Sequence, residues 1–215
     1  MTAAPRARKT DQQIKLRAWT GFASQDGARL SIDTGKGTVP GAPQTAAIEY
    51  LRAHDAAIAS AALGRVLKEY PRLRRENNAN VDYDEDDEVV AFERSIGIGG
   101  PRRLPAILTR SGLRDVMSLS TVHVLGVARN GFAYVGFQFS CDWDDEHEAG
   151  ILMHRRRVVA FGHADVAFTA WRATDDGGAS PRKVSAPSKP RRRALPRARG
   201  ARGSAGAPLA RAPRS

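Results

Sequence analysis

Two runs of alternating apolar residues, Thr121–Ala128 and Phe132–Phe139, flank the dipeptide Asn130-Gly131. Asn and Gly tolerate the positive φ angles of a tight two-residue turn, so this arrangement predicts a β-hairpin. A hairpin with one apolar face needs further strands or a helix to bury that face. The chain is therefore predicted to fold around an antiparallel sheet.

The hairpin is expected to belong to a larger α+β arrangement. Ile151–His154 and Val158–Gly162 read as a second strand pair, which extends the sheet to a four-stranded meander. Gln44–Tyr70 carries apolar residues three and four positions apart, which predicts one long helix with Pro43 in its first turn and Pro71 at its exit. We expect the sheet to pack against this helix.

The remaining segments of the body have weaker patterns. Ile14–Trp19 and Ala28–Asp33 are short β-like runs that predict an N-terminal hairpin, and Leu104–Leu119 predicts a less regular helix. Arg72–Asn80 is predicted to be a polar linker. The acidic run Asp82–Glu88 resembles a calcium loop in its spacing, but an aspartate occupies the position that requires glycine, so we expect a solvated loop before the strand-like run 89–92.

Charge separates the ends of the chain from its body. Eleven of the 34 Lys and Arg residues lie in residues 177–215, which contain no acidic residue, whereas residues 11–176 are slightly acidic. The C-terminal segment is rich in Arg, Pro and Ala and lacks the large apolar residues that would bury a core. We predict a flexible N-terminus at residues 1–10, a single α+β domain at 11–175 and a disordered basic tail at 176–215.

The sequence of the tail allows two interpretations: a solvated extension, or an arm that makes weak nonspecific contacts with nucleic acid through phosphate groups.

No stretch approaches the ~18 apolar residues of a membrane span, and a single cysteine, Cys141, excludes an intrachain disulfide. These features predict a soluble cytoplasmic protein without membrane association.

A cluster of charged residues interrupts the meander between its second and third strands. Strand periodicity places Cys141 and Trp143 in the core-facing phase, so Trp143 is expected to anchor the loop. The carboxylates next to Cys141 favour its neutral thiol, which makes it a buried apolar residue rather than a nucleophile. The charged members of the loop are Asp142, Asp144, Asp145, Glu146, His147 and Glu148.

A metal site is one interpretation of this cluster. His123, His147, His154 and His163 all lie in the meander, and imidazole with carboxylate suits zinc or a similar divalent ion. His147 and His154 would be the ligands, together with acidic residues of the loop. Their spacing matches no established metal motif, so the leading prediction includes no cofactor and no catalytic residue.

The segment Tyr134–His154 reads YVGFQFSCDWDDEHEAGILMH, and residues 162–168 read GHADVAF. It resembles an uncharacterised bacterial family of domains of unknown function with the motif YVGFxFxCxWDxEHxxGxxxH, and the similarity extends from about Ile14 to Phe168. The resemblance implies a small α+β fold without assigning an activity. The motif positions it marks are Trp143, Asp144, Glu146, His147, Gly150, His154 and Asp165. The Arg155-Arg156 turn and the basic tail depart from the family pattern.

Like charges packed into one loop repel each other, so a binding surface for a basic protein partner is the favoured functional reading. The predicted binding residues are Trp143, Asp144, Asp145, Glu146, His147, His154 and Asp165. The predicted role is a non-enzymatic protein-interaction domain of immunity or regulatory type, by fold-level analogy. The alternatives are a metal-dependent enzyme and a nucleic-acid-associated protein acting through its tail.

Overall fold

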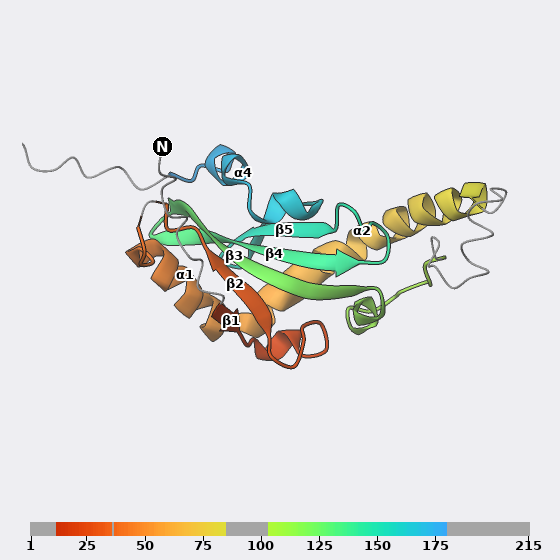
Figure 1. The fold of residues 1–215 in the computed structure, drawn as a ribbon, viewed down its shortest axis with the longest axis horizontal. Helices are drawn as coiled ribbons and strands as arrows, with labels where there is room; N and C mark the ends of the chain where they lie inside the picture. The colour runs from red at the N-terminus through yellow and green to blue at the C-terminus, as the bar shows by residue number, and fades with distance from the viewer. Residues whose placement is uncertain (1–11, 36, 85–102, 180–215) are drawn as a thin grey trace, which may run out of the picture. The chain divides into compact units, whose positions relative to one another are not determined.

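The computed structural model describes residues 12–35, 37–84 and 103–179, and these form an α+β fold around one six-stranded sheet (Figure 1). The strands follow one another across the sheet in chain order. They are β1 (Gln12–Ile14), β2 (Ala28–Ile32), β3 (Met117–Arg129), β4 (Phe132–Cys141), β5 (Ala149–His154) and β6 (Arg157–Gly162). The predicted N-terminus 1–10, residues 180–215 of the predicted tail, residues 85–88 of the predicted acidic loop and the run 89–92 lie outside the described residues. The first four residues of the predicted tail, 176–179, belong to the fold, since the backbones of Ala128 and Ala179 are hydrogen-bonded, and residues 82–84 of the predicted acidic loop belong to a helix.

The predicted four-stranded meander is confirmed, because β3, β4, β5 and β6 pair antiparallel in sequence. Asn130 and Gly131 adopt φ angles of 50° and 80° in the turn between β3 and β4, as the hairpin requires. Arg155 adopts a φ of 56° in the turn between β5 and β6. Local turn chemistry therefore sets the register of this half of the sheet.

The N-terminal strands attach to the meander through a parallel pair. β1 pairs antiparallel with β2, as predicted, but β2 pairs parallel with β3, so the sheet is mixed rather than wholly antiparallel. The predicted strand Ile14–Trp19 is wrong after its first residue, because β1 ends at Ile14 and Arg17–Trp19 forms a 3-10 turn, η1. This turn places Trp19 in the core, where its ring stacks on Phe137 with centroids 5.0 Å apart.

Two helices replace the single predicted helix Gln44–Tyr70. α1 (Ala42–Ala53) and α2 (Asp55–Asp84) meet at His54, which leaves helical geometry with φ −122° and ψ 23°. Pro43 lies in the first turn of α1, as predicted. The carboxylate of Asp55 accepts a hydrogen bond from the backbone of Ala18 at 2.8 Å, which joins the start of α2 to η1.

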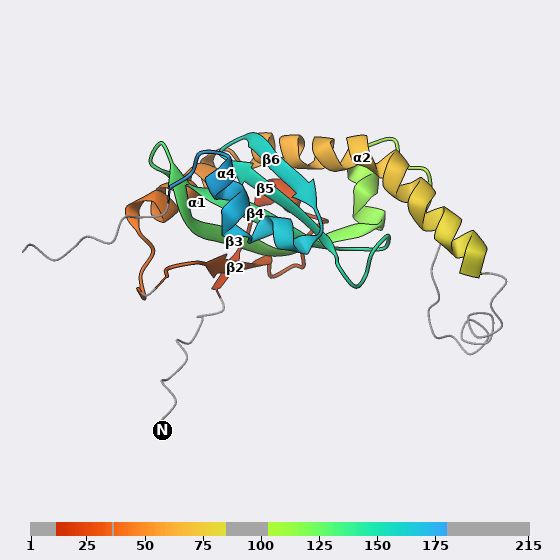
Figure 2. The same cartoon turned by 90° about the horizontal axis from the view of Figure 1, so that it is seen from above.

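The predicted exit at Pro71 and the linker Arg72–Asn80 are wrong, because α2 continues through both. A proline inside a helix removes one backbone hydrogen bond, so other contacts must hold the following turns. Arg74 donates to the carbonyl of Leu104 at 3.0 Å, and the Asn78 side chain accepts from the Leu104 backbone at 2.7 Å. These tertiary bonds sustain the helix, whose far end extends past the sheet (Figures 1 and 2).

The same bonds explain why the predicted helix Leu104–Leu119 is wrong. Both polar backbone groups of Leu104 and the carbonyl of Pro105 bond to α2 side chains, and residues 103–108 have no helical structure. The chain forms only a short 3-10 turn, η2 (Ser111–Asp115), before β3 begins at Met117. Tertiary contacts therefore override the local apolar pattern.

The two faces of the sheet are covered differently, as the two views show (Figures 1 and 2). On one face, α1 and α2 pack large apolar side chains against residues such as Phe137 and Ile151. On the other face, η3 (Ala164–Ala167) and α4 (Ala170–Asp175) pack against Tyr134 and Leu152. Among the described helices, none has the length and apolar character needed to cross a membrane.

Glycines bring the second layer very close to the strands. A Cβ atom on Gly136 would lie 1.6 Å from the carbonyl oxygen of Ala167, and one on Gly150 would lie 2.5 Å from that of His163. Both distances are shorter than any real contact, so only glycine allows η3 to lie directly on β4 and β5. This contact fixes where His163 emerges beside the loop between β4 and β5.

Candidate functional site

The loop 142–148, here called the acidic loop, is held by backbone hydrogen bonds at several points. The N–H of Asp142 donates to the carbonyl of Val116 at 2.9 Å, and the N–H of Ala164 donates to the carbonyl of His147 at 3.0 Å. Glu148 ends the loop with a φ of 55° and accepts bonds from Gln138 at 2.5 Å and Ser140 at 3.0 Å. The loop therefore has a defined conformation.

Cys141 and Trp143 point toward the core, as strand periodicity predicts. The Cys141 thiol is buried and donates to the carbonyl of Asp144 at 3.4 Å. Burial raises the pKa of Cys141 to about 12, so its thiol is neutral near pH 7. Trp143 is half-buried and packs against Tyr70 of α2, edge to face, with centroids 6.0 Å apart.

The outer carboxylates of the acidic loop have no recorded ion pair with a basic side chain among the residues that the structure describes. Asp142, Asp145 and Glu146 are exposed, and no Lys or Arg side chain in the described part of the chain forms an ion pair with them. The fold therefore leaves this group of negative charges facing solvent.

Asp144 differs, because two imidazoles converge on its carboxylate. Nδ1 of His147 lies 3.1 Å from Oδ1 of Asp144, and Nε2 of His163 lies 3.8 Å from Oδ2. The two rings have centroids 4.9 Å apart. Asp144, His147 and His163 thus form one compact cluster, which joins the acidic loop to the segment that follows β6.

A groove of about 420 Å³ runs beside this cluster, between α2 and the end of β6. Trp143, Asp144, Glu148 and His163 form one wall. The α2 wall carries arginines that are paired within the helix, such as Arg72 with Glu76 at 2.6 Å. Asp144 and Glu148 are therefore the carboxylates in the groove that no Arg or Lys of the described residues neutralises.

The structure brings together Trp143 and the charged loop residues Asp144, Asp145, Glu146 and His147, but places His154 elsewhere. His154 ends β5 and lies ~17 Å along the strand from Ala149, which borders the loop. It is buried, its Nε2 donates to the carbonyl of Arg129 at 3.0 Å, and its ring lies against Tyr134. His147 and His154 therefore do not meet at one ion.

Asp165 has a local role in the structure. It lies in η3, where its backbone carbonyl accepts bonds from Phe168 at 3.1 Å and Thr169 at 2.9 Å, while its side chain is exposed. The third member of the cluster is His163, two residues before Asp165, and neither Asp165 nor His154 belongs to it.

Comparison with known proteins identifies a family. A family model described as a domain of unknown function, DUF6985, matches residues 13–168. The chain belongs to this family. No curated protein and no solved structure matches the chain. The match contains the acidic loop, His163 and the whole of α2, so the candidate site lies within the DUF6985 domain.

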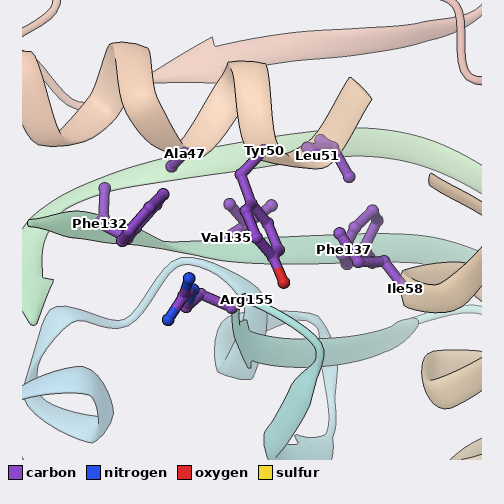
Figure 3. Close-up of a pocket in the computed structure, with 9 residues that line it drawn as sticks. Ala47, Tyr50, Leu51, Ile58, Phe132, Val135, Phe137 and Arg155 are labelled. Atoms are coloured by element: carbon purple, nitrogen blue, oxygen red, sulfur yellow. The ribbon is translucent and has the colours of Figure 1, made fainter. Parts of the chain in front are cut away.

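Two further hollows of the DUF6985 domain have a different character. A void of about 10 Å³ between α1 and β4 is lined mainly by apolar side chains and closed by Arg155 (Figure 3). It is too small for a ligand, and the Arg155 guanidinium lies 4.5 Å from the Phe132 ring centroid and 5.0 Å from that of Tyr50. The second hollow lies over the turns at this end of the sheet and is lined by Arg129, His154 and Arg155–Arg157.

Sequence reasoning missed the contribution of α2 to the groove. Glu69 faces it from the last turn of the predicted helix, and Arg72 and Glu76 face it from turns beyond the predicted helix end. The signal available in the sequence was the i, i+4 pairing of Arg72 with Glu76, which is typical of a continuing helix.

Proposed function

We propose that this DUF6985 domain is a non-enzymatic interaction domain that binds a basic protein partner through the acidic loop and the adjoining groove. The observation that carries the proposal is the group of exposed carboxylates on Asp142, Asp145 and Glu146, which no basic side chain of the described residues neutralises. Like charges this close in sequence repel one another, and the backbone bonds hold the loop without their help. A cationic partner would relieve that repulsion.

The groove suits a lysine or arginine side chain from such a partner. Asp144 and Glu148 supply negative charge, and the half-buried ring of Trp143 supplies an aromatic surface on the same wall. A cation between a carboxylate and an indole gains both Coulombic and cation–π energy. Clustered charge around the groove would also accelerate encounter with a basic partner.

A regulatory or immunity-type role is the class of function that this binding mode supports, since both act by occupying a partner's surface. The neutral Cys141 thiol argues against a nucleophilic role for the cysteine. His154 and Asp165, predicted binding residues, are not part of the proposed surface, because one is buried at the other end of β5 and the other lies on η3.

The test begins with a photo-crosslinking amino acid at position 145 of the full-length chain, expressed in its source cells, to identify the partner. The purified partner is then titrated with the variant Asp142→Asn, Asp145→Asn, Glu146→Gln. The matched control Asp26→Asn, Glu49→Gln, Asp175→Asn removes the same charge from exposed positions elsewhere.

We expect the loop variant to weaken binding about tenfold or more, mainly through slower association at low salt, and the control to bind like the wild type. Equal affinity for all three proteins would overturn the proposal. A loss that the control variant shares would assign the effect to net charge, and would also overturn it.

A further inference from the structure

We infer that Asp144, His147 and His163 form a binding site for one divalent transition-metal ion of the zinc class, at the rim of the groove beside α2. This site shares Asp144 and His163 with the groove but goes beyond the proposed interaction surface, since the proposed function is carried by the exposed carboxylates of Asp142, Asp145 and Glu146. It also differs from the His147 and His154 pair that the sequence suggests, because the fold replaces His154 with His163 and adds Asp144.

The spacing of the donor atoms fits a tetrahedral ion. One donor atom from each residue lies within 4.8 Å of the other two. Nδ1 of His147 lies 3.1 Å from Oδ1 of Asp144, and Nε2 of His163 lies 3.8 Å from Oδ2 of the same carboxylate. Ligands at the usual zinc distances are ~3.4 Å from one another, so small side-chain rotations suffice. The histidine side chains are 59% and 65% exposed, which leaves them free to make these rotations.

The backbone prepares this arrangement in two ways. The N–H of His147 donates to Oδ1 of Asp144 at 2.9 Å, which orients the carboxylate and leaves Oδ2 directed toward His163. The N–H of Ala164 donates to the carbonyl of His147, and Gly150 allows the His163 backbone to lie against β5. Such supporting bonds reduce the cost of ordering ligands when an ion binds.

The donor set selects the class of ion. Two imidazole nitrogens favour zinc, cobalt, nickel or iron over calcium and magnesium, which prefer oxygen ligands. Three protein ligands leave at least one coordination position for water or for a group from another molecule. Asp144 and His163 both line the groove, so an ion between them would present that open position at its rim.

The surrounding charge would attract a dication. Asp142, Asp145 and Glu146 flank the cluster along the loop, and no basic side chain of the cluster's own segments pairs with them. A concentrated negative potential raises the local concentration of divalent ions. Glu148 is a less suitable ligand, because Gln138 and Ser140 already bond to both of its carboxylate oxygens.

The test uses full-length protein purified without a histidine tag and treated with a chelator. Co²⁺ is added while the visible d–d absorption of the protein is recorded, and Zn²⁺ affinity is measured by competition with a colorimetric chelator. The variants are His147→Ala and His163→Ala, with His54→Ala as a matched control, since His54 is an exposed histidine at the end of α1.

We expect one equivalent of metal, a tetrahedral cobalt spectrum, and affinity weakened 10- to 100-fold or more in each cluster variant but unchanged in the control. Zinc should raise the Tm of the wild type but not of His163→Ala, whose metal-free Tm should match the wild type. If His163→Ala fails to fold, His163→Gln serves as the second variant.

Binding of less than one equivalent, or equal affinity in His163→Ala and wild type, would overturn the inference. The loop variant Asp142→Asn, Asp145→Asn, Glu146→Gln keeps all three ligands and should bind zinc within a few-fold of the wild type. Failure of metal binding and failure of partner binding are therefore separate results.

Discussion

The two ends of the β4–β5 pair both carry clustered charge, but among the described residues only the basic end has ion pairs between arginine and carboxylate. At the basic end, Arg129 and Arg157 both pair with Asp176, and Tyr134 donates to the same carboxylate at 2.8 Å. At the acidic end, Asp145 and Glu146 have no such partner in the described part of the chain. Charge that is compensated within the fold serves structure, whereas uncompensated charge on an ordered loop is available for binding.

The contrast extends to packing. Arg155 of the basic end stacks on Phe132 and Tyr50, so its guanidinium covers apolar surface between α1 and β4. The acidic loop contributes only Trp143 to apolar packing, while its carboxylates point outward. The comparison therefore predicts different responses to mutation at the two ends.

The largest expected effect is on the alkylation rate of Cys141. This residue lies at the base of the acidic loop, so the reactivity of its thiol reports whether the loop covers it. Its pKa rises from 9.0 to about 12 on burial, so the reactive thiolate should be roughly 1,000-fold rarer in the folded protein. We expect iodoacetamide to modify native protein at pH 8 by orders of magnitude more slowly than protein unfolded in urea, as followed by mass spectrometry.

Trp143→Ala is the informative companion variant, since it removes the apolar anchor of the loop. It should increase the native alkylation rate. Native and unfolded wild-type protein reacting at similar rates would show that the acidic loop does not cover Cys141, and would weaken the contrast between the two ends.

Asp176→Ala should have the next largest effect, at the basic end. It leaves the buried Tyr134 hydroxyl and two arginines without their shared acceptor, so the free energy of unfolding should fall by about 1–3 kcal/mol. Asp175→Ala is the control, because this neighbouring aspartate is exposed and should change stability by less than ~0.5 kcal/mol. Urea unfolding followed by circular dichroism measures both.

The same carboxylate makes stability depend on acid pH. Hydrogen bonding from Arg157, followed by that from Tyr134, lowers the pKa of Asp176 below its ordinary value of 3.8. The folded protein thus favours the charged form, and this stabilisation is present above the unfolded pKa and lost as pH falls through the folded pKa. Asp176→Asn should lose less stability than wild type on acidification below about pH 4; an unchanged pH profile would contradict the assigned role.

Neutralising the acidic loop should have the smallest effect on stability. The variant Asp142→Asn, Asp145→Asn, Glu146→Gln removes like charges that form no ion pair with Lys or Arg of the described residues. We expect the free energy of unfolding to change by no more than ~0.5 kcal/mol, with any gain diminishing at high salt. A loss of more than ~1 kcal/mol would mean that these carboxylates are structural after all.

Sequence reasoning succeeded where local chemistry decides the outcome. The Asn130-Gly131 turn predicts its hairpin because few other residues accept two successive positive φ angles. Strand periodicity correctly predicted that Cys141 is buried, since the alternation of side-chain direction continues to the last residue of β4. The loop that contains Trp143 and Asp144 was found for the same reason, because it interrupts that alternation.

Sequence reasoning failed where distant contacts outweigh local preference. Pro71 ordinarily predicts a helix end, but bonds from Arg74 and Asn78 to Leu104 hold the turns that follow it. The parallel pairing of β2 with β3 joins strands separated by two helices, and no short-range pattern encodes it.

The sequence by itself determined the antiparallel meander, the position of the acidic loop and the separation of an acidic body from basic ends, because periodicity, turn residues and charge are local properties. Only the tertiary structure decided which histidine meets Asp144. Gly136 and Gly150 let η3 lie directly on the strands, which brings His163 to the loop, while the extended length of β5 carries His154 away from it. Partners at a site are set by packing between segments, and the spacing of residues along the chain does not specify that packing.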